Sequence, residues 1–178
     1  MKRVFILAFS LFFVAGSQLF AQESHQYIGA EKCKTCHKKE KAGKQYLIWK
    51  DGPHANAMKT LSSPEAMKIA KEKGIADPAK DPSCLKCHST YASLKPEQLH
   101  AKGKLKLEEG VSCESCHGAG ADYKKKKIMK DQKTAIANGL ILPEEKVCKS
   151  CHNDESPTFK SFDFKKAVKE ISHPTPAK

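Results

Sequence analysis

Four copies of one short motif constrain this chain more than any other feature of its sequence. Each copy is Cys-x-x-Cys followed directly by histidine. The copies are CKTCH at 33–37, CLKCH at 84–88, CESCH at 113–117 and CKSCH at 148–152. Together they contain all eight cysteines of the 178-residue chain. Any fold of this chain must therefore accommodate these four motifs.

Two ordinary uses of paired cysteines leave the histidine unexplained. A secreted chain can join its cysteines in disulfides, and two Cys-x-x-Cys pairs can hold a zinc ion. Either arrangement leaves the residue after the second cysteine unconstrained, yet here it is histidine four times. Cys-x-x-Cys-His is the attachment motif of c-type haem. Two cysteines form thioethers with the porphyrin, and the histidine binds the iron from one face.

The motifs thus predict four covalently bound haem c groups. The predicted attachment residues are Cys33, Cys36, Cys84, Cys87, Cys113, Cys116, Cys148 and Cys151. The predicted proximal iron ligands are His37, His88, His117 and His152.

Only four other histidines remain to bind the opposite faces of the irons. We expect His54 and His173 to be distal ligands, and His25 and His100 are further candidates. The match in number is suggestive, although an exposed histidine without a ligand role is common. Thioether ligation offers an alternative through Met58, Met67 or Met129, but methionine more often fills gaps in packing.

The first 21 residues have the layout of a secretory signal peptide. Lys2 and Arg3 precede an apolar run at 4–14, and Ala21 ends a plausible cleavage site. An uncleaved anchor is the alternative, but the run is shorter than the roughly 20 residues that span a bilayer. We therefore expect residues 22–178 to reach the periplasm without stable membrane insertion.

The rest of the chain is poor in the residues that build a protein core. Only three of its eight phenylalanines lie after residue 21, and the mean hydropathy of the whole chain is −0.57. Such a chain is either disordered or receives its core from something other than side chains. Four porphyrins, each a large flat apolar body, would supply that core.

The sequence favours a mostly α-helical fold with extensive loops, organised around four stacked haems, and little or no sheet. Helices are expected at 38–50, from Pro64 towards Gly74, at 96–103 and from Asp163 to Ile171. The four motifs are irregularly spaced, which argues against a repeated module. We therefore expect one domain at 22–178, with a flexible tail at 174–178.

The sequence resembles the tetrahaem cytochrome c-554 family. Three stretches carry the resemblance: HANAM at 54–58, GVSCESCHGAG at 110–120 and FDFKKAVKEISH at 162–173. The resemblance implies a mostly helical fold with haems in closely stacked pairs. The type member of this family is an electron acceptor.

The resemblance also implies which residues bind the irons. His54 would cap the haem held by His117, and His173 the haem held by His152. The haem of His88 would be five-coordinate. The family caps its first haem with a histidine several residues after the third motif, but residues 122–127 here read DYKKKK. The sixth ligand of the haem on His37 is therefore His25, His100 or Met129, or the position is open.

The net charge of the chain helps to predict which kinds of partner it binds. The formal net charge is +12, of which Lys2 and Arg3 belong to the predicted signal peptide. Two propionates on each haem would offset most of the remainder, which argues against nucleic acid as a partner. The lysine run at 124–127 could steer an acidic redox protein, although a solvated basic face is the more ordinary interpretation.

Two functions from different classes remain. The chain could be an electron carrier between redox partner proteins, with no substrate site. Alternatively, it could be an enzyme that reduces a small nitrogen or sulfur species at a five-coordinate haem. Catalysis needs an open iron and a nearby proton donor, and no acid or base in the sequence marks such a pocket. The carrier is the favoured hypothesis, with no catalytic residue assigned.

Overall fold

The structure is a computed structural model and describes residues 25–173. The predicted signal peptide at 1–21 and the predicted tail at 174–178 lie outside these residues.

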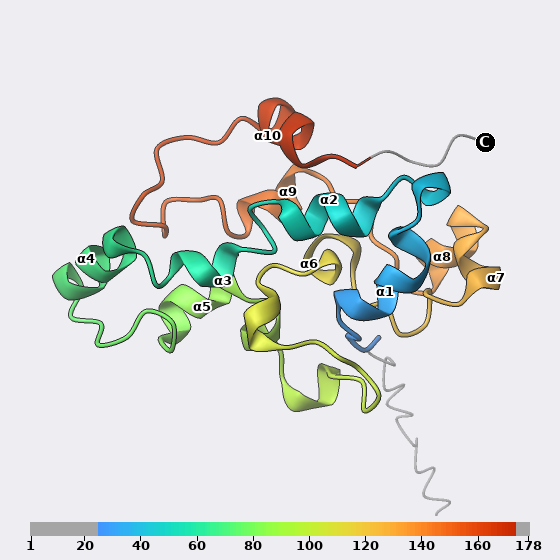
Figure 1. Cartoon of the computed structure of the whole chain (residues 1–178), viewed down its shortest axis with the longest axis horizontal. Helices are drawn as coiled ribbons and strands as arrows, with labels where there is room; N and C mark the ends of the chain where they lie inside the picture. The colour runs from blue at the N-terminus through green and yellow to red at the C-terminus, as the bar shows by residue number, and fades with distance from the viewer. Residues whose placement is uncertain (1–24, 174–178) are drawn as a thin grey trace, which may run out of the picture.

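The described chain consists of short helices joined by loops (Figure 1). Its α-helices are α1 (Ala30–His37), α2 (Gln45–Asp51), α3 (Ala57–Thr60), α4 (Pro64–Glu72), α5 (Pro82–His88), α6 (Cys113–His117), α7 (Lys126–Met129), α8 (Gln132–Ala137), α9 (Glu145–Lys149) and α10 (Phe164–Ile171). Its 3-10 helices are η1 (Glu40–Ala42), η2 (Tyr91–Ser93), η3 (Pro96–Gln98) and η4 (Leu107–Glu109). Between residues 25 and 173, β-pairing is limited to an isolated parallel bridge between Tyr27 and Leu99. The prediction of a mostly helical fold with little or no sheet is confirmed.

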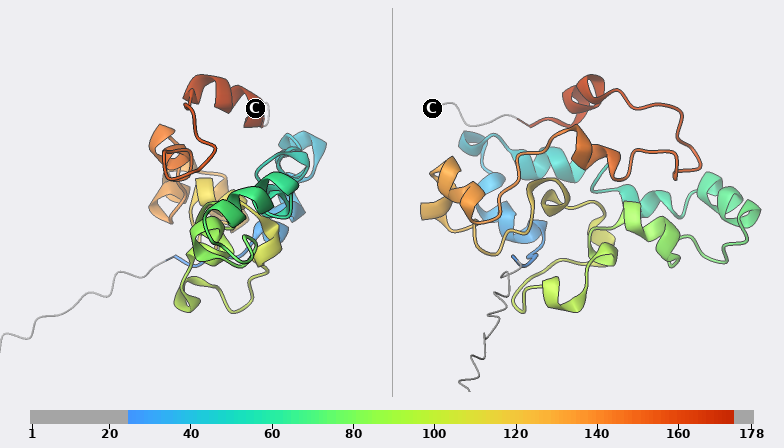
Figure 2. Two further views of the ribbon diagram at one scale, coloured as in Figure 1. Left: turned by 90° about the vertical axis from the view of Figure 1, so that its left-hand side faces the viewer. Right: turned by 180° about the vertical axis from the view of Figure 1, so that it is seen from behind.

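The helices fall into two groups at opposite ends of the molecule. Figure 1 shows α3, α4 and α5 at one end and α1, α7 and α8 at the other, with α6 between them. The reverse view in Figure 2 shows the same division. Helix α6 also contacts α9, and α10 lies above α2 and α9 in Figure 1. All four motifs are carried on helices of this scaffold or directly after one.

Two of the predicted helices form where capping residues start them. The Ser63 side chain accepts a hydrogen bond of 3.2 Å from the Ala66 N–H, and Pro64 occupies the first turn of α4. Helix α10 begins in the same way, because the Asp163 side chain accepts from the Lys166 N–H at 3.0 Å. Both predictions from the sequence are confirmed.

Two other predicted helices are wrong. The segment 38–50 is broken because Gly43 and Lys44 have φ angles of 94° and 54°, which no right-handed helix contains. The segment 96–103 forms only η3, after which Leu99 is extended and the His100 N–H donates to the Tyr27 carbonyl at 3.0 Å. A tertiary contact with the N-terminal segment thus replaces the helix.

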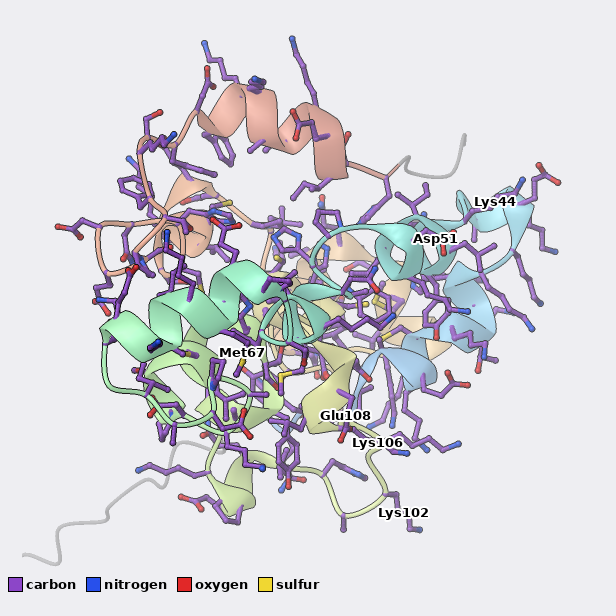
Figure 3. The ribbon with its side chains drawn as sticks, turned by 60° about the vertical axis from the view of Figure 1, so that its left-hand side comes forward. Lys44, Asp51, Met67, Lys102, Lys106 and Glu108 are labelled. Carbon is purple, nitrogen blue, oxygen red and sulfur yellow. The ribbon has the colours of Figure 1, made fainter. Side chains whose placement is uncertain are left out.

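Few apolar side chains are buried in the described part of the chain. The buried ones are Ile28, Ala30, Leu61, Ala70, Leu85, Leu105, Ala119, Tyr123 and Ala135. Several large apolar side chains are instead exposed, among them Ile136, Leu142 and Met67, which is 49% exposed on α4 (Figure 3). Protein side chains alone therefore supply only a small core, as the composition predicts.

A buried carboxylate joins two distant parts of the chain. Glu114 lies in α6 and is 1% exposed. Its oxygens accept hydrogen bonds from the backbone N–H groups of Ile28 (2.9 and 3.1 Å), Gly29 (2.7 Å) and Gly120 (2.7 Å). Burial raises the pKa of Glu114, and these N–H groups offset the rise only in part. Glu114 thereby holds the segment before the first motif against the third motif.

Replacing this carboxylate should destabilise the protein. Glu114→Ala should lower the free energy of unfolding by about 3 kcal/mol or more, since each buried N–H left without an acceptor costs about 1 to 3 kcal/mol. Chemical denaturation of the haem-loaded protein, followed by far-UV circular dichroism, measures the change. Glu108→Ala is the matched control, because Glu108 is exposed on η4 (Figure 3). An equal loss in both variants would contradict the prediction.

The raised pKa of Glu114 also predicts a pH dependence. A carboxyl group whose folded pKa lies above its unfolded value contributes most to stability below the unfolded value, and the contribution is lost as pH rises through the folded pKa. Stability of the wild type should therefore decrease over this range as pH rises. Glu114→Gln should abolish that part of the decrease, and an unchanged pH profile would contradict it.

Candidate haem-binding site

Each motif occupies a single turn of helix, or the end of one. The first motif forms the C-terminal half of α1, the second ends α5, and the third makes up α6. The fourth begins in α9 and finishes in the turn that follows it. Residues three and four apart on a helix lie on the same face, so each turn presents two thiols and one imidazole together. All eight thiols are free of disulfides.

The motifs lie beside one another in a definite order. The thiol of Cys113 is hydrogen-bonded to Cys33, and this contact, together with burial, raises its pKa. Burial and the neighbouring Cys151 raise the pKa of Cys87 to about 11. Cys116 is partly buried and lies near Cys148, and both effects raise its pKa. The first motif therefore adjoins the third, the third adjoins the fourth, and the fourth adjoins the second.

Two histidine pairs face each other at the spacing of an axial ligand pair. The ring centres of His54 and His152 are 6.1 Å apart, and those of His117 and His173 are 5.9 Å apart. An iron between two imidazoles would separate the ring centres by roughly 6 Å, of which about 2 Å is each metal–nitrogen bond. Both pairs therefore fit a haem iron held from two sides.

These partners differ from those that the resemblance implies, which sets His54 opposite His117 and His173 opposite His152. The geometry of α10 explains the exchange. Phe162 stacks on His152 with ring centres 4.9 Å apart, and α10 then runs for eight residues, about 12 Å. The helix thus carries His173 away from His152 and places it beside His117.

Burial favours the neutral form of one imidazole in each pair. It lowers the pKa of His54, with a smaller contribution from His152. Burial also lowers the pKa of His117. A neutral imidazole has the lone pair that a metal needs, so both rings are in the protonation state of an iron ligand at neutral pH.

Hydrogen bonds at Nδ1 orient three of the four motif histidines. His88 Nδ1 donates to the Ala57 carbonyl at 2.7 Å, and His117 Nδ1 to the Ile141 carbonyl at 3.3 Å. His37 Nδ1 lies 3.3 Å from Gln45 Oε1. An oxygen acceptor at Nδ1 places the ring proton there and leaves the Nε2 lone pair for a metal.

A cavity surrounds the second and fourth motifs. Its volume is about 840 Å³, within the range of cofactor pockets, about 300 to 1,000 Å³. Its walls include apolar side chains from α3, α4 and α10 and the loops around them: Leu61, Ile69, Val111, Phe162, Val168 and Ile171. The lining also contains all six cysteines and histidines of the two motifs. This cavity fits large flat apolar groups attached at its thiols.

The two motif histidines that line the cavity differ in whether another histidine lies opposite them. The histidines that line it are His54, His88 and His152. His54 is paired with His152, so no other histidine of the lining remains to face His88. This arrangement agrees with the open position that the resemblance implies for the haem on His88.

The other two candidate ligands lie outside this cavity. His25 Nδ1 is 2.8 Å from Asp122 Oδ2, and the two side chains are 39% and 46% exposed. His100 lies in the loop after η3, where its Nδ1 accepts a hydrogen bond of 3.0 Å from the Lys102 N–H. Of the candidate methionines, Met58 lies in α3, Met67 in α4 and Met129 at the end of α7.

Two residues of the site were not identified from the sequence. Glu114 occupies a variable position of the third motif and reads as an ordinary surface residue of a short helix. Asp122 stands out in the sequence only as part of a loop that lacks histidine. Both act through contacts with residues 25–29, about 90 positions earlier, and no local pattern reveals such contacts.

The motifs, the histidine pairs and the helical scaffold define a multihaem c-type cytochrome. Residues 32–118 match the family model described as cytochrome c554 and c-prime. The chain belongs to this cytochrome c554 family. It is 32% identical over 162 residues to cytochrome c-554 of Nitrosomonas europaea, an alignment that takes in 83% of this chain and 66% of that protein. The chain thus spans slightly less than two thirds of the length of this curated relative.

No solved structure matches the chain significantly. Among residues 25–173, no helix is both long and apolar enough to cross a membrane.

The exchanged histidine partners can be tested by counting high-spin irons. In a background that lacks the fourth haem (Cys148→Ser, Cys151→Ser), His54→Ala should add no high-spin iron, because its haem is absent. His173→Ala in the same background should add one, on the haem of His117. Electron paramagnetic resonance measures both, and mass spectrometry confirms that three haems remain. The reverse result would support the partners implied by the resemblance.

Proposed function

We propose that the protein is a periplasmic tetrahaem cytochrome that transfers electrons between a donor protein and an acceptor protein. The observation that carries this proposal is the continuous row of attachment motifs. Cys33 lies beside Cys113, Cys116 lies near Cys148, and Cys151 lies beside Cys87. A chain that only stored or sensed haem has no need to bring four attachment sites into one row.

Haem iron, once bound, supplies one-electron chemistry. The residues of the chain hold and tune it: the eight cysteines anchor the four groups, and His37, His88, His117 and His152 bind the irons. His54 and His173 complete two of the axial pairs. The hydrogen bonds at Nδ1 fix the rings of His37, His88 and His117 and raise their basicity, which favours the oxidised iron. Apolar side chains line the cavity at the second and fourth sites and would pack against the groups bound there.

Haem attachment at the four motifs also bears on the extent of the domain and on the compartment in which the protein functions. The described motifs lie on one scaffold, which supports a single tetrahaem domain at 22–178. The predicted signal peptide at 1–21 supports export to the periplasm, where haem is attached to such motifs. Exposed lysines at 124–127 lead into α7 and form its first turn, and they would favour an acidic redox partner over nucleic acid.

An enzyme is the second candidate, and the surroundings of His88 favour it. His88 faces a cavity in which the other two histidines form their own pair. A vacant iron position there would admit a small nitrogen or sulfur species. The electron carrier remains the better proposal, because three of the four motifs have no role in such a reaction except as a conduit.

The haem count tests the proposal directly. The protein, expressed with c-type haem maturation in a bacterial periplasm, should show a mass increase of four haems. Cys113→Ser with Cys116→Ser should lose one of the four, and the remaining groups should still be reduced and reoxidised reversibly. Fewer than four haems in the wild type, or no reversible redox chemistry, would contradict the proposal.

Small ligands separate the carrier from the enzyme. Nitric oxide should perturb the absorption of one haem in four, that of His88, while nitrite and hydroxylamine are not turned over by the reduced protein. Stopped-flow absorption with each compound measures this. Catalytic reoxidation by nitrite or hydroxylamine would instead establish the enzyme, and a ligand response from no haem would exclude an open site at His88.

A further inference from the structure

The iron ligand opposite His37 is the one that neither the motif nor the resemblance provides. The loop after the third motif has no histidine at 122–127. The structure nevertheless brings a histidine to that loop from another part of the chain. His25, at the start of the described residues, hydrogen-bonds to Asp122.

The hydrogen bond to Asp122 gives His25 the tautomer of a metal ligand. A carboxylate oxygen can only accept, so His25 Nδ1 carries the proton at 2.8 Å from Asp122 Oδ2. The lone pair then lies on Nε2. His37, His88 and His117 have the same arrangement, each with Nδ1 next to an oxygen. Carboxylate–histidine–metal arrangements of this kind are common in metal sites.

His100, the other candidate, has the opposite arrangement. Its Nδ1 accepts from the Lys102 N–H at 3.0 Å, so Nδ1 holds the lone pair. In the neutral ring, Nε2 must then carry the proton and has no lone pair for a metal. His100 could bind iron only after this loop contact is broken, whereas His25 needs no such change.

The surroundings of His25 place it at the end of the molecule that holds the first and third motifs. The Gln26 carbonyl accepts a hydrogen bond of 3.0 Å from the Ala121 N–H. Tyr123, one residue after Asp122, is buried, and its pKa is raised by that burial and by the nearby Cys33. Neither His25 nor His37 lines the cavity around the second and fourth motifs.

Within residues 25–173, one motif histidine at this end has no ring partner. His117 already faces His173, which leaves His37. The chain from His25 leads directly into α1, and Glu114 holds its backbone at Ile28 and Gly29. His25 is therefore fixed relative to both the helix that carries His37 and the loop that carries Asp122.

Gly139 provides the surface on which the His25 ring lies. A Cβ atom at Gly139 would be 2.5 Å from His25 Cδ2, and its φ of 96° also disfavours any other residue. The ring is thus held by Asp122 on one edge and by the backbone at Gly139. Two independent contacts fix its position, as a preorganised ligand requires.

We propose that His25 is the sixth ligand of the haem iron bound through His37, and that Asp122 is the positioning residue that orients its ring. This inference rests on the proposed tetrahaem function. The ligand has moved from the loop after the third motif to the segment before the first, and the loop retains the carboxylate that orients it. The negative charge of Asp122 makes His25 a more basic ligand and lowers the reduction potential of that haem.

The proposal is tested by spectroscopy of the haem-loaded protein. Electron paramagnetic resonance of the oxidised wild type should show one high-spin iron, on His88, and three low-spin irons. His25→Ala should show two high-spin irons, and added imidazole should return one of them to low spin. His100→Ala is the matched control and should leave the wild-type spectrum unchanged.

The role of Asp122 has its own readout. In Asp122→Asn the amide oxygen can still accept from Nδ1, so three irons should remain low-spin. The loss of charge should shift one of the four reduction potentials upward in a spectroelectrochemical titration. A purely structural role for Asp122 would leave all four potentials in place.

The outcomes separate this inference from the proposed function. Two high-spin irons in the wild type, or no change in His25→Ala, would overturn the assignment of His25 while four haems remain bound. A new high-spin iron in His100→Ala would assign the ligand to His100 instead and overturn the proposal. Loss of haem from the wild type itself would refute the tetrahaem function, whatever the variants show.

Discussion

The Glu114 carboxylate is the interaction on which the arrangement of the first and third motifs depends. It lies inside the third motif and accepts hydrogen bonds from the backbone of Ile28 and Gly29, just before the first motif begins. A buried charge is costly unless hydrogen bonds satisfy it, and here three N–H groups do so. The two motifs are therefore held in register by hydrogen bonds from backbone N–H groups to one side-chain carboxylate, which do not depend on apolar packing.

Such polar contacts matter because the described chain buries so few apolar residues. Five of its nine buried apolar side chains are larger than alanine, while Ile136, Leu142 and Val168 remain exposed. Large apolar groups attached at the motifs would cover part of this surface. The cavity around the second and fourth motifs is lined by buried apolar side chains such as Leu61 and by exposed ones such as Val168. Short helices then suffice, since their task is to present cysteines and histidines to the attached groups.

The sequence predicted what local chemistry determines. The four motifs, the positions of α4 and α10 and, within residues 25–173, the lack of extended sheet all follow from residues close together in the chain. Predictions failed where distant segments meet and where a local turn interrupts a helix. The segment 96–103 was wrong because Leu99 pairs with Tyr27, and the helix at 38–50 because Gly43 and Lys44 turn the chain. The ring neighbours of His54 and His173 in the structure, His152 and His117, differ from the partners that the resemblance implies, because they depend on the path of α10, which no local pattern encodes.

His25 and His100 show how much a single hydrogen bond adds to what the sequence predicts about the iron ligands. In the sequence they are equivalent, two histidines outside the motifs with no local signal to separate them. The structure gives one an acceptor at Nδ1 and the other a donor, and the position of one proton then decides which ring can offer Nε2 to a metal. The number of histidines limits how many irons can have two axial ligands. For His25 and His100, the hydrogen-bond partner of Nδ1 is what separates the proposed ligand from the other candidate.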